Sequence, residues 1–157
     1  MTDSTSPDAA TRPPGPPLAY RLGYAGLLPF AAGAVGVWIA PAGWKPVIEA
    51  ALIGYAAVIL AFMGAVHWGL AMAGRPERRS LQLGLSVLPA LLGWVALLLP
   101  AGLAYPLVMA AFLALLAFDR RAVALGLAPR WYPSLRTPLT AGVLLSLALA
   151  YAHLLAR

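Results

Sequence analysis

Charged residues divide this chain into long uncharged stretches, and the lengths of those stretches limit what the chain can fold into. Four stretches contain no Asp, Glu, Lys or Arg: residues 22–44, 50–74, 80–118 and 137–156. A helix needs about 20 apolar residues to cross a hydrocarbon core of about 30 Å. Residues 80–118 would measure about 58 Å as one helix, which is enough for two crossings. The sequence therefore predicts an all-α, polytopic membrane helix bundle.

The overall composition supports this prediction. Hydrophobic residues make up 62% of the chain and charged residues only 10%, whereas soluble domains carry about 25% charged residues. The net charge is +6. We expect it to orient the chain in the membrane and to contact anionic lipid headgroups, and not to bind nucleic acid, because the arginines lie in short loops beside the spans. The chain has no Cys, which excludes disulfides, thiolate metal sites and thiol catalysis.

Proline and glycine define the predicted helix ends. Pro100 and Gly102 divide the longest stretch in two, and Thr137 with Pro138 is expected to form the N-cap and first residue of the last helix. Charge patterning alone cannot separate five spans from three spans plus a re-entrant hairpin. Five transmembrane helices are predicted, at about 22–39, 46–72, 81–99, 103–118 and 138–155.

The flanking charges predict an orientation. Residues 1–18 are rich in Pro, Ser and Thr and are expected to form a disordered cytoplasmic tail, ahead of a single transmembrane helical domain over 19–157. With the N-terminus inside, the cytoplasmic side holds nine Lys and Arg residues and the other side two. The positive-inside rule therefore predicts that the N-terminus is cytoplasmic and the C-terminus is outside. The nine are Arg12, Arg21, Arg75, Arg78, Arg79, Arg120, Arg121, Arg130 and Arg136; the two are Lys45 and Arg157.

His67 is the polar residue placed most informatively within a predicted span. Helical spacing puts it beside the small residues Gly54, Ala57, Ala61 and Gly64, which let helices approach closely, so it is expected to face protein. An intramembrane imidazole can relay protons, bind a ligand or hold a metal. The alternative is a neutral imidazole that donates a hydrogen bond to a backbone carbonyl on a neighbouring helix, and the lack of a second nearby metal ligand favours it.

Two carboxylates lie near predicted span ends. Glu49 is expected in the first turn of its helix, where it complements the helix dipole; the alternative is an entry carboxylate for a cation path. Asp119 closes the fourth predicted helix, where an anion is unfavourable. We therefore expect a local salt bridge or a contact with Arg75, Arg78 or Arg79 to hold it.

Prolines inside the spans predict kinks. Pro29 and Pro89 each remove a helical hydrogen bond, and each has a Gly four residues later. A parallel repeat of two helices would place both kinks around a central cavity, although chance explains so short a match better. Residues 119–136 are expected to form a cytoplasmic loop that lies at the membrane surface as a short helix. Its Trp131, with other aromatic residues near the span ends, is typical of an interfacial aromatic belt.

No catalytic, cofactor or metal motif is found. Gly23-Tyr24-Ala25-Gly26 lacks the strand, turn and Lys-Ser/Thr of a phosphate loop. The two histidines, His67 and His153, lie at opposite predicted faces of the membrane, so no Ser/His/Asp set can be assembled. We therefore expect no enzyme activity, cofactor or metal.

Four blocks of sequence resemble the domain-of-unknown-function family 3429, the transmembrane protein 69-like small integral membrane proteins. The resemblance covers roughly residues 20–155 and implies a small multi-pass protein of a bacterial inner membrane, or of the mitochondrial inner membrane in a eukaryote. It singles out as pattern positions Pro29, Gly64, His67, Trp68, Gly69, Trp131, Leu135 and Arg136. The blocks are LGYAGLLPF (22–30), FMGAVHWG (62–69), Leu88-Pro89 with Gly93-Trp94, and PRWYPSLRTPLT (129–140).

Two functions remain as hypotheses. The first is an accessory, assembly or interaction subunit of a membrane complex, docked to a membrane-protein partner or to a second copy. The second is a small transporter or a proton or ion pathway that uses His67 and the kinks at Pro29 and Pro89.

Overall fold

The chain forms helices and no strand throughout the part that the structure describes. The structure is a computed structural model that describes residues 16–73 and 79–157. Its helices are α1 (Pro17–Ala25), α2 (Leu28–Ile39), the short 3-10 helix η1 (Ala42–Trp44), α3 (Lys45–Ala73), α4 (Arg79–Leu98), α5 (Ala101–Ala124) and α6 (Tyr132–Leu155). Residues 1–15 of the predicted Pro-rich tail over 1–18 lie outside the described residues, whereas Pro16 is the N-cap of α1 and Pro17 and Leu18 belong to that helix.

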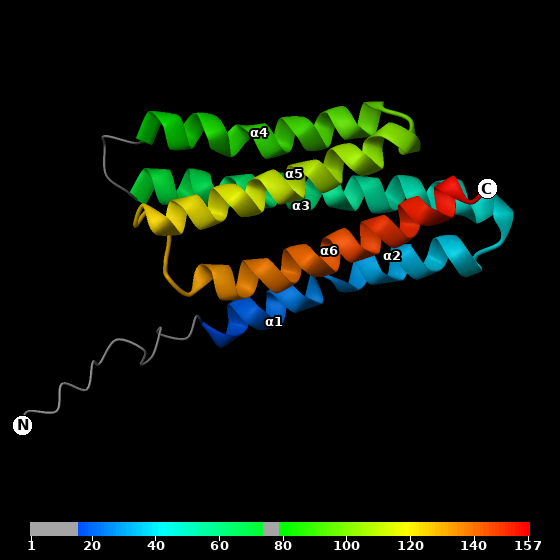
Figure 1. The fold of residues 1–157 in the computed structure, drawn as a ribbon, viewed down its shortest axis with the longest axis horizontal. Coiled ribbons are helices and arrows are strands. Elements are labelled where there is room, and N and C mark those ends of the chain that lie inside the picture. Colours follow the sequence, from blue (N-terminus) through cyan, green and yellow to red (C-terminus); the bar gives the residue numbers. More distant parts are fainter. Residues whose placement is uncertain (1–15, 74–78) are drawn as a thin grey trace, which may run out of the picture.

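Five helical passes run side by side, as the sequence predicts (Figure 1). The pair α1–α2 makes the first pass, and α3, α4, α5 and α6 follow in alternating directions, so residue 16 and the C-terminus lie at opposite ends. Four passes are long and apolar enough to cross a membrane, and α4 contains a shorter apolar helix over Gln82–Leu98. With its 20 residues, α4 is about 30 Å long, a full crossing. The protein is a multi-pass membrane helix bundle, and a re-entrant hairpin is not needed.

The first pass is interrupted just before Pro29. The α-helix stops after Ala25 and resumes at Leu28, and Pro29 occupies the first turn of α2, where its missing N–H costs little. The hydroxyl of Tyr55 on α3 donates a hydrogen bond to the carbonyl of Gly26 over 3.0 Å. The predicted kink is therefore a short break that a side chain from another helix stabilises.

The connection between α5 and α6 differs from its prediction. The prediction of a loop over 119–136 is wrong in its bounds, because α5 runs to Ala124 and α6 starts at Tyr132. The arginines after Asp119 stay on the helix while their side chains are exposed, as long cationic side chains allow. The N-cap prediction for Thr137 is wrong for the same reason: Pro133 lies in the first turn of α6, and Pro138 lies inside it. Gly126, with a φ of 70°, ends the turn after α5.

The closest helix pair is α3 with α4. A Cβ on Gly64 would collide with the carbonyl oxygen of Ser86, and a Cβ on Gly93 would lie 3.0 Å from the Cα of Ala57. Pro89 is buried in the same contact, next to Gly64. Small residues on α3 therefore allow close helix packing, as predicted. The helix that packs against them is α4 of this chain and not a helix of a partner protein.

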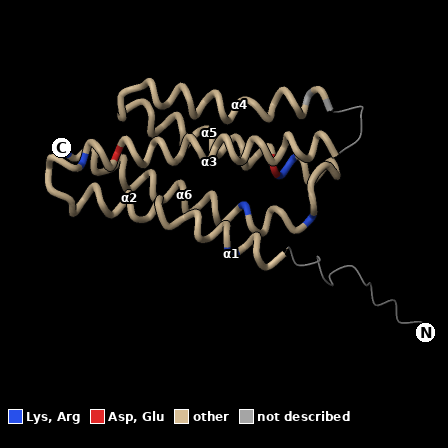
Figure 2. Tube along the Cα trace, turned by 180° about the vertical axis from the view of Figure 1, so that it is seen from behind, with Lys and Arg blue, Asp and Glu red and all other residues tan. Residues whose placement is uncertain are grey.

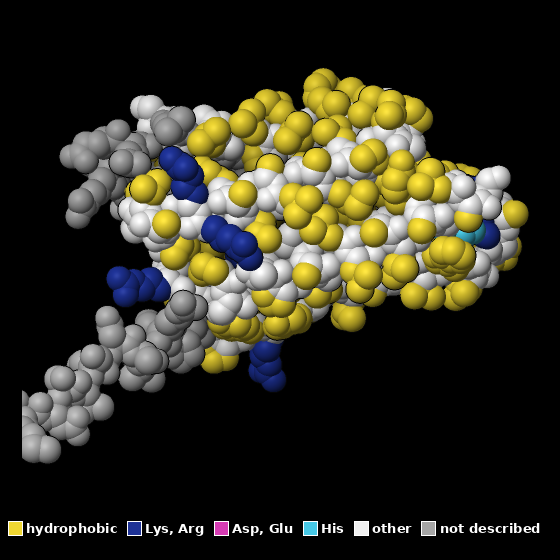
Figure 3. Space-filling view, viewed as in Figure 1, with side chains coloured by type: hydrophobic (Ala, Val, Ile, Leu, Met, Phe, Trp, Pro, Cys, Tyr) yellow, Lys and Arg dark blue, Asp and Glu magenta, His cyan; other side chains and the backbone are white. Residues whose placement is uncertain are grey.

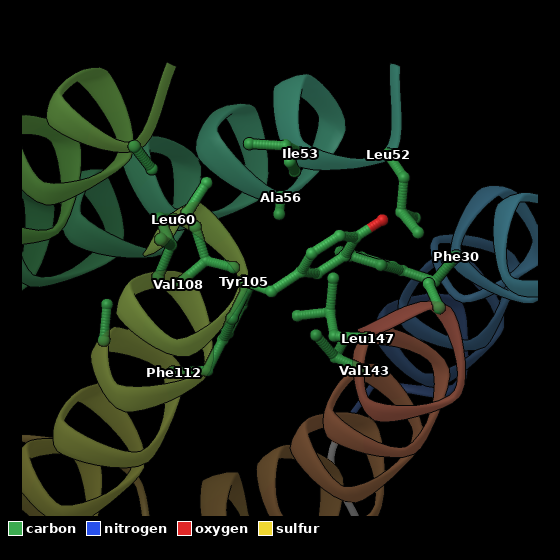
Figure 4. Close-up of a cluster of buried hydrophobic side chains, with 14 of the residues drawn as sticks. Phe30, Leu52, Ile53, Ala56, Leu60, Tyr105, Val108, Phe112, Val143 and Leu147 are labelled. Carbon is green, nitrogen blue, oxygen red and sulfur yellow. The ribbon is translucent and has the colours of Figure 1, made fainter. Parts of the chain in front are cut away.

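The interior between the passes is apolar. Side chains from α2, α3, α5 and α6 meet around Tyr105 (Figure 4). The outer surface is apolar as well, and Lys and Arg gather toward the end where α1 begins (Figure 3). A lipid environment accounts for a bundle that is apolar inside and outside. The largest buried apolar side chains include Phe30, Val37, Leu60, Tyr105, Val108, Phe112 and Leu147.

Candidate functional site

Three ionisable side chains from three helices meet inside the bundle. Nε2 of His67 on α3 lies 2.6 Å from Oδ1 of Asp119 on α5, and Nε of Arg136 on α6 lies 2.7 Å from Oδ2 of the same carboxylate. All three are buried, with exposed fractions of 0% for His67, 1% for Asp119 and 4% for Arg136. Figure 2 shows acidic and basic residues side by side near the α5–α6 connection. We call this group the His–Asp–Arg cluster.

The helix ends explain why these side chains are buried. Asp119 lies inside α5 because that helix continues to Ala124, and Arg136 lies inside α6 because that helix begins at Tyr132. His67 is six residues before the end of α3, about 9 Å along the helix. The cluster is therefore within the helical part of the bundle, near one end.

Asp119 has two partners that the sequence did not predict. The sequence predicts a local salt bridge or a contact with Arg75, Arg78 or Arg79; Arg75 and Arg78 lie outside the described residues, and the structure pairs Asp119 with His67 and Arg136. Its two oxygens each accept one charge-assisted or polar hydrogen bond, so the carboxylate joins three helices. His67 is also packed against the ring of Phe118, with ring centroids 4.4 Å apart. His67 thus faces protein, and its partner is a carboxylate in place of the expected backbone carbonyl.

The cluster leaves some hydrogen-bonding capacity unused. Nδ1 of His67 and Nη2 of Arg136 are buried and have no hydrogen-bond partner among the described residues. Two more buried hydroxyls on α6 are in the same state, those of Tyr132 and Thr140. Sequence reasoning did not find Tyr132 and Thr140 as site residues. Their spacing of four residues on either side of Arg136 is the signal, because it places all three on one helix face.

A second charged group lies at the opposite end of the bundle. Glu49 on α3 is buried and forms a salt bridge with the half-exposed Arg157 at the end of α6. Nζ of Lys45 lies 3.4 Å from Nε2 of His153, and the Trp38 ring packs against that imidazole with centroids 4.9 Å apart. The expected placement of Glu49 in the first turn of its helix is wrong, because the first turn of α3 holds no acidic residue; Glu49 is buried and paired with Arg157.

The remaining predicted candidates do not form one site. Gly64 and Pro89 meet at the contact between α3 and α4, whereas Pro29 is exposed in the first turn of α2. The kinks at Pro29 and Pro89 thus do not frame a shared central cavity. Trp68 and Gly69 lie on the exposed side of α3, where a Cβ on Gly69 would meet nothing within 4 Å.

Trp131 lies at the start of α6, and its ring centroid is 6.3 Å from that of Tyr20 on α1. Within the described residues, no group of three His, Cys, Asp or Glu side chains is close enough to hold a metal ion. Of the expected candidates, the structure therefore brings together His67, Asp119 and Arg136.

Comparison with known proteins agrees with this architecture. A model of the family described as protein of unknown function DUF3429 matches residues 15–152. Transmembrane protein 69 of Xenopus tropicalis is 31% identical over 134 residues, which are 84% of this chain and 53% of that relative. The chain thus spans about half the length of the curated relative it matches. No solved structure matches the chain.

Proposed function

We propose that this chain, which belongs to the DUF3429 family, is an accessory, assembly or interaction subunit of a membrane complex and acts by binding a partner within the bilayer. One observation carries the proposal. The charged groups inside the described part of the bundle are paired with one another at its two ends, and an apolar core separates the two groups.

The distance between the charged groups is close to the thickness of a bilayer core. Glu49 and His67 are eighteen residues apart on α3, about 27 Å along the helix, and a hydrocarbon core measures about 30 Å. Between them lie apolar side chains such as Leu60, Val108 and Phe112, each at most 1% exposed (Figure 4). Moving a charge through such a region is expensive, and this supports a binding role over a conducting one.

The partner would contact an outer face of the bundle. The small residues Ala57 and Gly64 are already covered by α4, so they are not available to a partner helix. Large apolar side chains are exposed on several helices, among them Val58 on α3, Trp94 on α4 and Leu145 on α6. These three positions sample three helices and allow the face to be mapped.

The experiment is photo-crosslinking in the native membrane. A benzophenone amino acid replaces Val58, Trp94 or Leu145 in three separate full-length chains with an N-terminal tag. After illumination the tagged chains are purified under denaturing conditions and identified by mass spectrometry. We expect one membrane protein in stoichiometric yield from one position and lipid adducts at the others, which serve as matched controls. Lipid adducts alone at all three positions, together with a lone chain after mild detergent extraction, would contradict the proposal.

The compartment and the lipid contacts are part of the same proposal. We infer residence in a bacterial inner membrane, or in the mitochondrial inner membrane of a eukaryote, with the arginine-rich end toward the cytoplasm or matrix. Arg120, Arg121 and Arg130 are exposed near that end and would contact anionic headgroups. Vesicles with and without an anionic lipid test this: reduced association with anionic vesicles after Arg120→Gln with Arg121→Gln supports it.

The His–Asp–Arg cluster favours a second candidate, a proton or ion pathway. Buried ionisable groups within a membrane span commonly mark such routes, and His67 contributes a group that can exchange protons. Purified protein in liposomes tests this with a pH-sensitive dye. A proton flux that disappears in a folded His67→Leu variant would favour the pathway over the binding role. The absence of flux in the unchanged protein would exclude the pathway.

A further inference from the structure

A cavity of about 470 Å³ opens between α1, α3 and α6. It lies beside the His–Asp–Arg cluster, because Arg136 is part of its wall. Its volume falls within the range of small-molecule sites, roughly 300–1,000 Å³. Most of the wall is apolar, and much of it is aromatic: Phe30, Tyr55, Phe62, Phe112, Trp131 and Tyr132.

One part of the wall is polar. Arg136, Thr140 and Tyr132 all line the cavity, and they lie at intervals of four residues on α6. Nη2 of Arg136, the hydroxyl of Thr140 and the hydroxyl of Tyr132 are buried without a hydrogen-bond partner among the described residues. Leaving such groups unsatisfied in an apolar medium is unfavourable.

The Thr140 hydroxyl differs from the hydroxyls of three serines in these helices. Ser86, Ser134 and Ser146 each donate to a backbone carbonyl three or four residues earlier, which is the usual way for a helix to satisfy a hydroxyl. Thr140 has no such bond, although it is only 2% exposed. Thr140 therefore lines the cavity with a buried hydroxyl that has no partner among the described residues.

The charge state of the wall sets the chemistry of that molecule. Asp119 accepts a hydrogen bond from Nε of Arg136 and balances its charge, so Nη2 acts as a donor beside an already neutralised pair. A guanidinium group has no acceptor atom, and a hydroxyl can donate as well. The matching group on a ligand is an uncharged oxygen acceptor attached to an apolar body.

We propose that this cavity binds a membrane-soluble molecule whose carbonyl oxygen accepts hydrogen bonds from Arg136 and Thr140 while its apolar body lies among the aromatic side chains. Two sources share this chemistry: a quinone ring with an apolar tail, and the acyl ester of a lipid. The aromatic wall fits the planar quinone ring well. The site is independent of any protein partner.

Native mass spectrometry of the full-length protein, released from detergent, tests the proposal with three probes of similar size. The probes are a decyl-substituted benzoquinone, a short-chain diacylglycerol and decylbenzene, which lacks oxygen. We expect a one-to-one complex with at least one carbonyl probe and weaker binding of decylbenzene. Preference for the benzoquinone or for the diacylglycerol identifies the source, and either preference supports the proposal.

Two variants on α6 test the polar wall. Thr140→Val keeps the shape of the side chain and removes its donor, so binding of the preferred carbonyl probe is expected to weaken about three- to tenfold, the effect of one neutral hydrogen bond. Thr137→Val is the matched control, because Thr137 does not line the cavity, and its affinity should be unchanged. Tyr132→Phe removes another donor and replaces the first variant if that one does not fold.

Several outcomes would overturn the proposal. Equal binding of decylbenzene and the carbonyl probes would leave the polar wall without a role. Equal weakening in Thr140→Val and Thr137→Val would indicate a general loss of structure. The absence of any complex with the folded protein would leave buried water as the partner of these donors.

Discussion

At the scale of single residues, Asp119 holds the arginine end of the bundle together. Its two oxygens contact His67 and Arg136, which belong to different helices. Removing one partner of a buried ion pair leaves an uncompensated charge, and that loss exceeds the net contribution of the intact pair. The three members of the cluster should therefore respond very differently to substitution.

We expect Asp119→Asn to lower the free energy of unfolding by about 3 kcal/mol, because the buried Arg136 guanidinium loses its counter-charge. The double variant Asp119→Asn with Arg136→Gln should recover most of that loss, to within about 1 kcal/mol, because no charge is left unpaired. Unfolding in mixed detergent micelles measures both. Glu49→Gln is the control: its partner Arg157 is 39% exposed, so the loss should stay below about 1 kcal/mol. A double variant less stable than the single one would contradict this account.

Sequence patterns identified the members of the cluster but not their pairing. His67 and Arg136 were singled out separately, and Asp119 was assigned other arginines. The pairing depends on which helices are neighbours and on where α5 ends, and neither follows from hydropathy. Thr140 and Tyr132 were missed because a hydroxyl in a helix ordinarily bonds its own backbone, so its type alone predicts no site.

At the scale of helices, the contact between α3 and α4 depends on Gly64. A side chain there meets the carbonyl of Ser86, which is backbone and cannot rotate away. The existence of the five helices could be predicted because an apolar stretch has few alternatives in lipid. The ends of α5 and α6 could not, because charged residues suggest a loop even where a helix extends into the headgroup region.

We expect Gly64→Ala to destabilise the protein by about 1–3 kcal/mol, since the added methyl group forces the two helices apart. Gly69→Ala is the matched control on the same helix: it faces open space, and Ala should be neutral or slightly stabilising there. Thermal unfolding in detergent compares the two. Similar stability of both variants would show that α3 and α4 can separate at little cost.

At the scale of the whole molecule, an odd number of passes places the described ends of the chain at opposite ends of the bundle (Figure 1). On the face that Figure 3 shows, the described Lys and Arg side chains lie mostly toward the end where α1 begins. The positive-inside rule predicts that this end is cytoplasmic. Architecture and orientation are thus separate matters, because a bundle can have the same contacts in either orientation.

We expect a fluorescent protein fused to the N-terminus to be active in the cytoplasm, and an alkaline phosphatase fused after Arg157 to be active outside it. The opposite pair of fusions should be inactive and is the internal control. Exchanging Arg120, Arg121 and Arg130 for Gln should reduce the bias and produce a mixed population. Active phosphatase at the N-terminus would reverse the proposed orientation.

The sequence separation of 17 between Asp119 and Arg136 also has a consequence for synthesis and insertion. A lone Asp or Arg at the centre of a helix costs about 2.5–3.5 kcal/mol at the translocon. Because the two partners belong to consecutive helices, α5 and α6 can enter the bilayer together with the charges of Asp119 and Arg136 balanced. We expect a nascent chain truncated before Arg136 to have a poorly inserted α5, measurable by protease protection, and Asp119→Leu to restore its insertion. Stable insertion of α5 would then depend on the synthesis of α6.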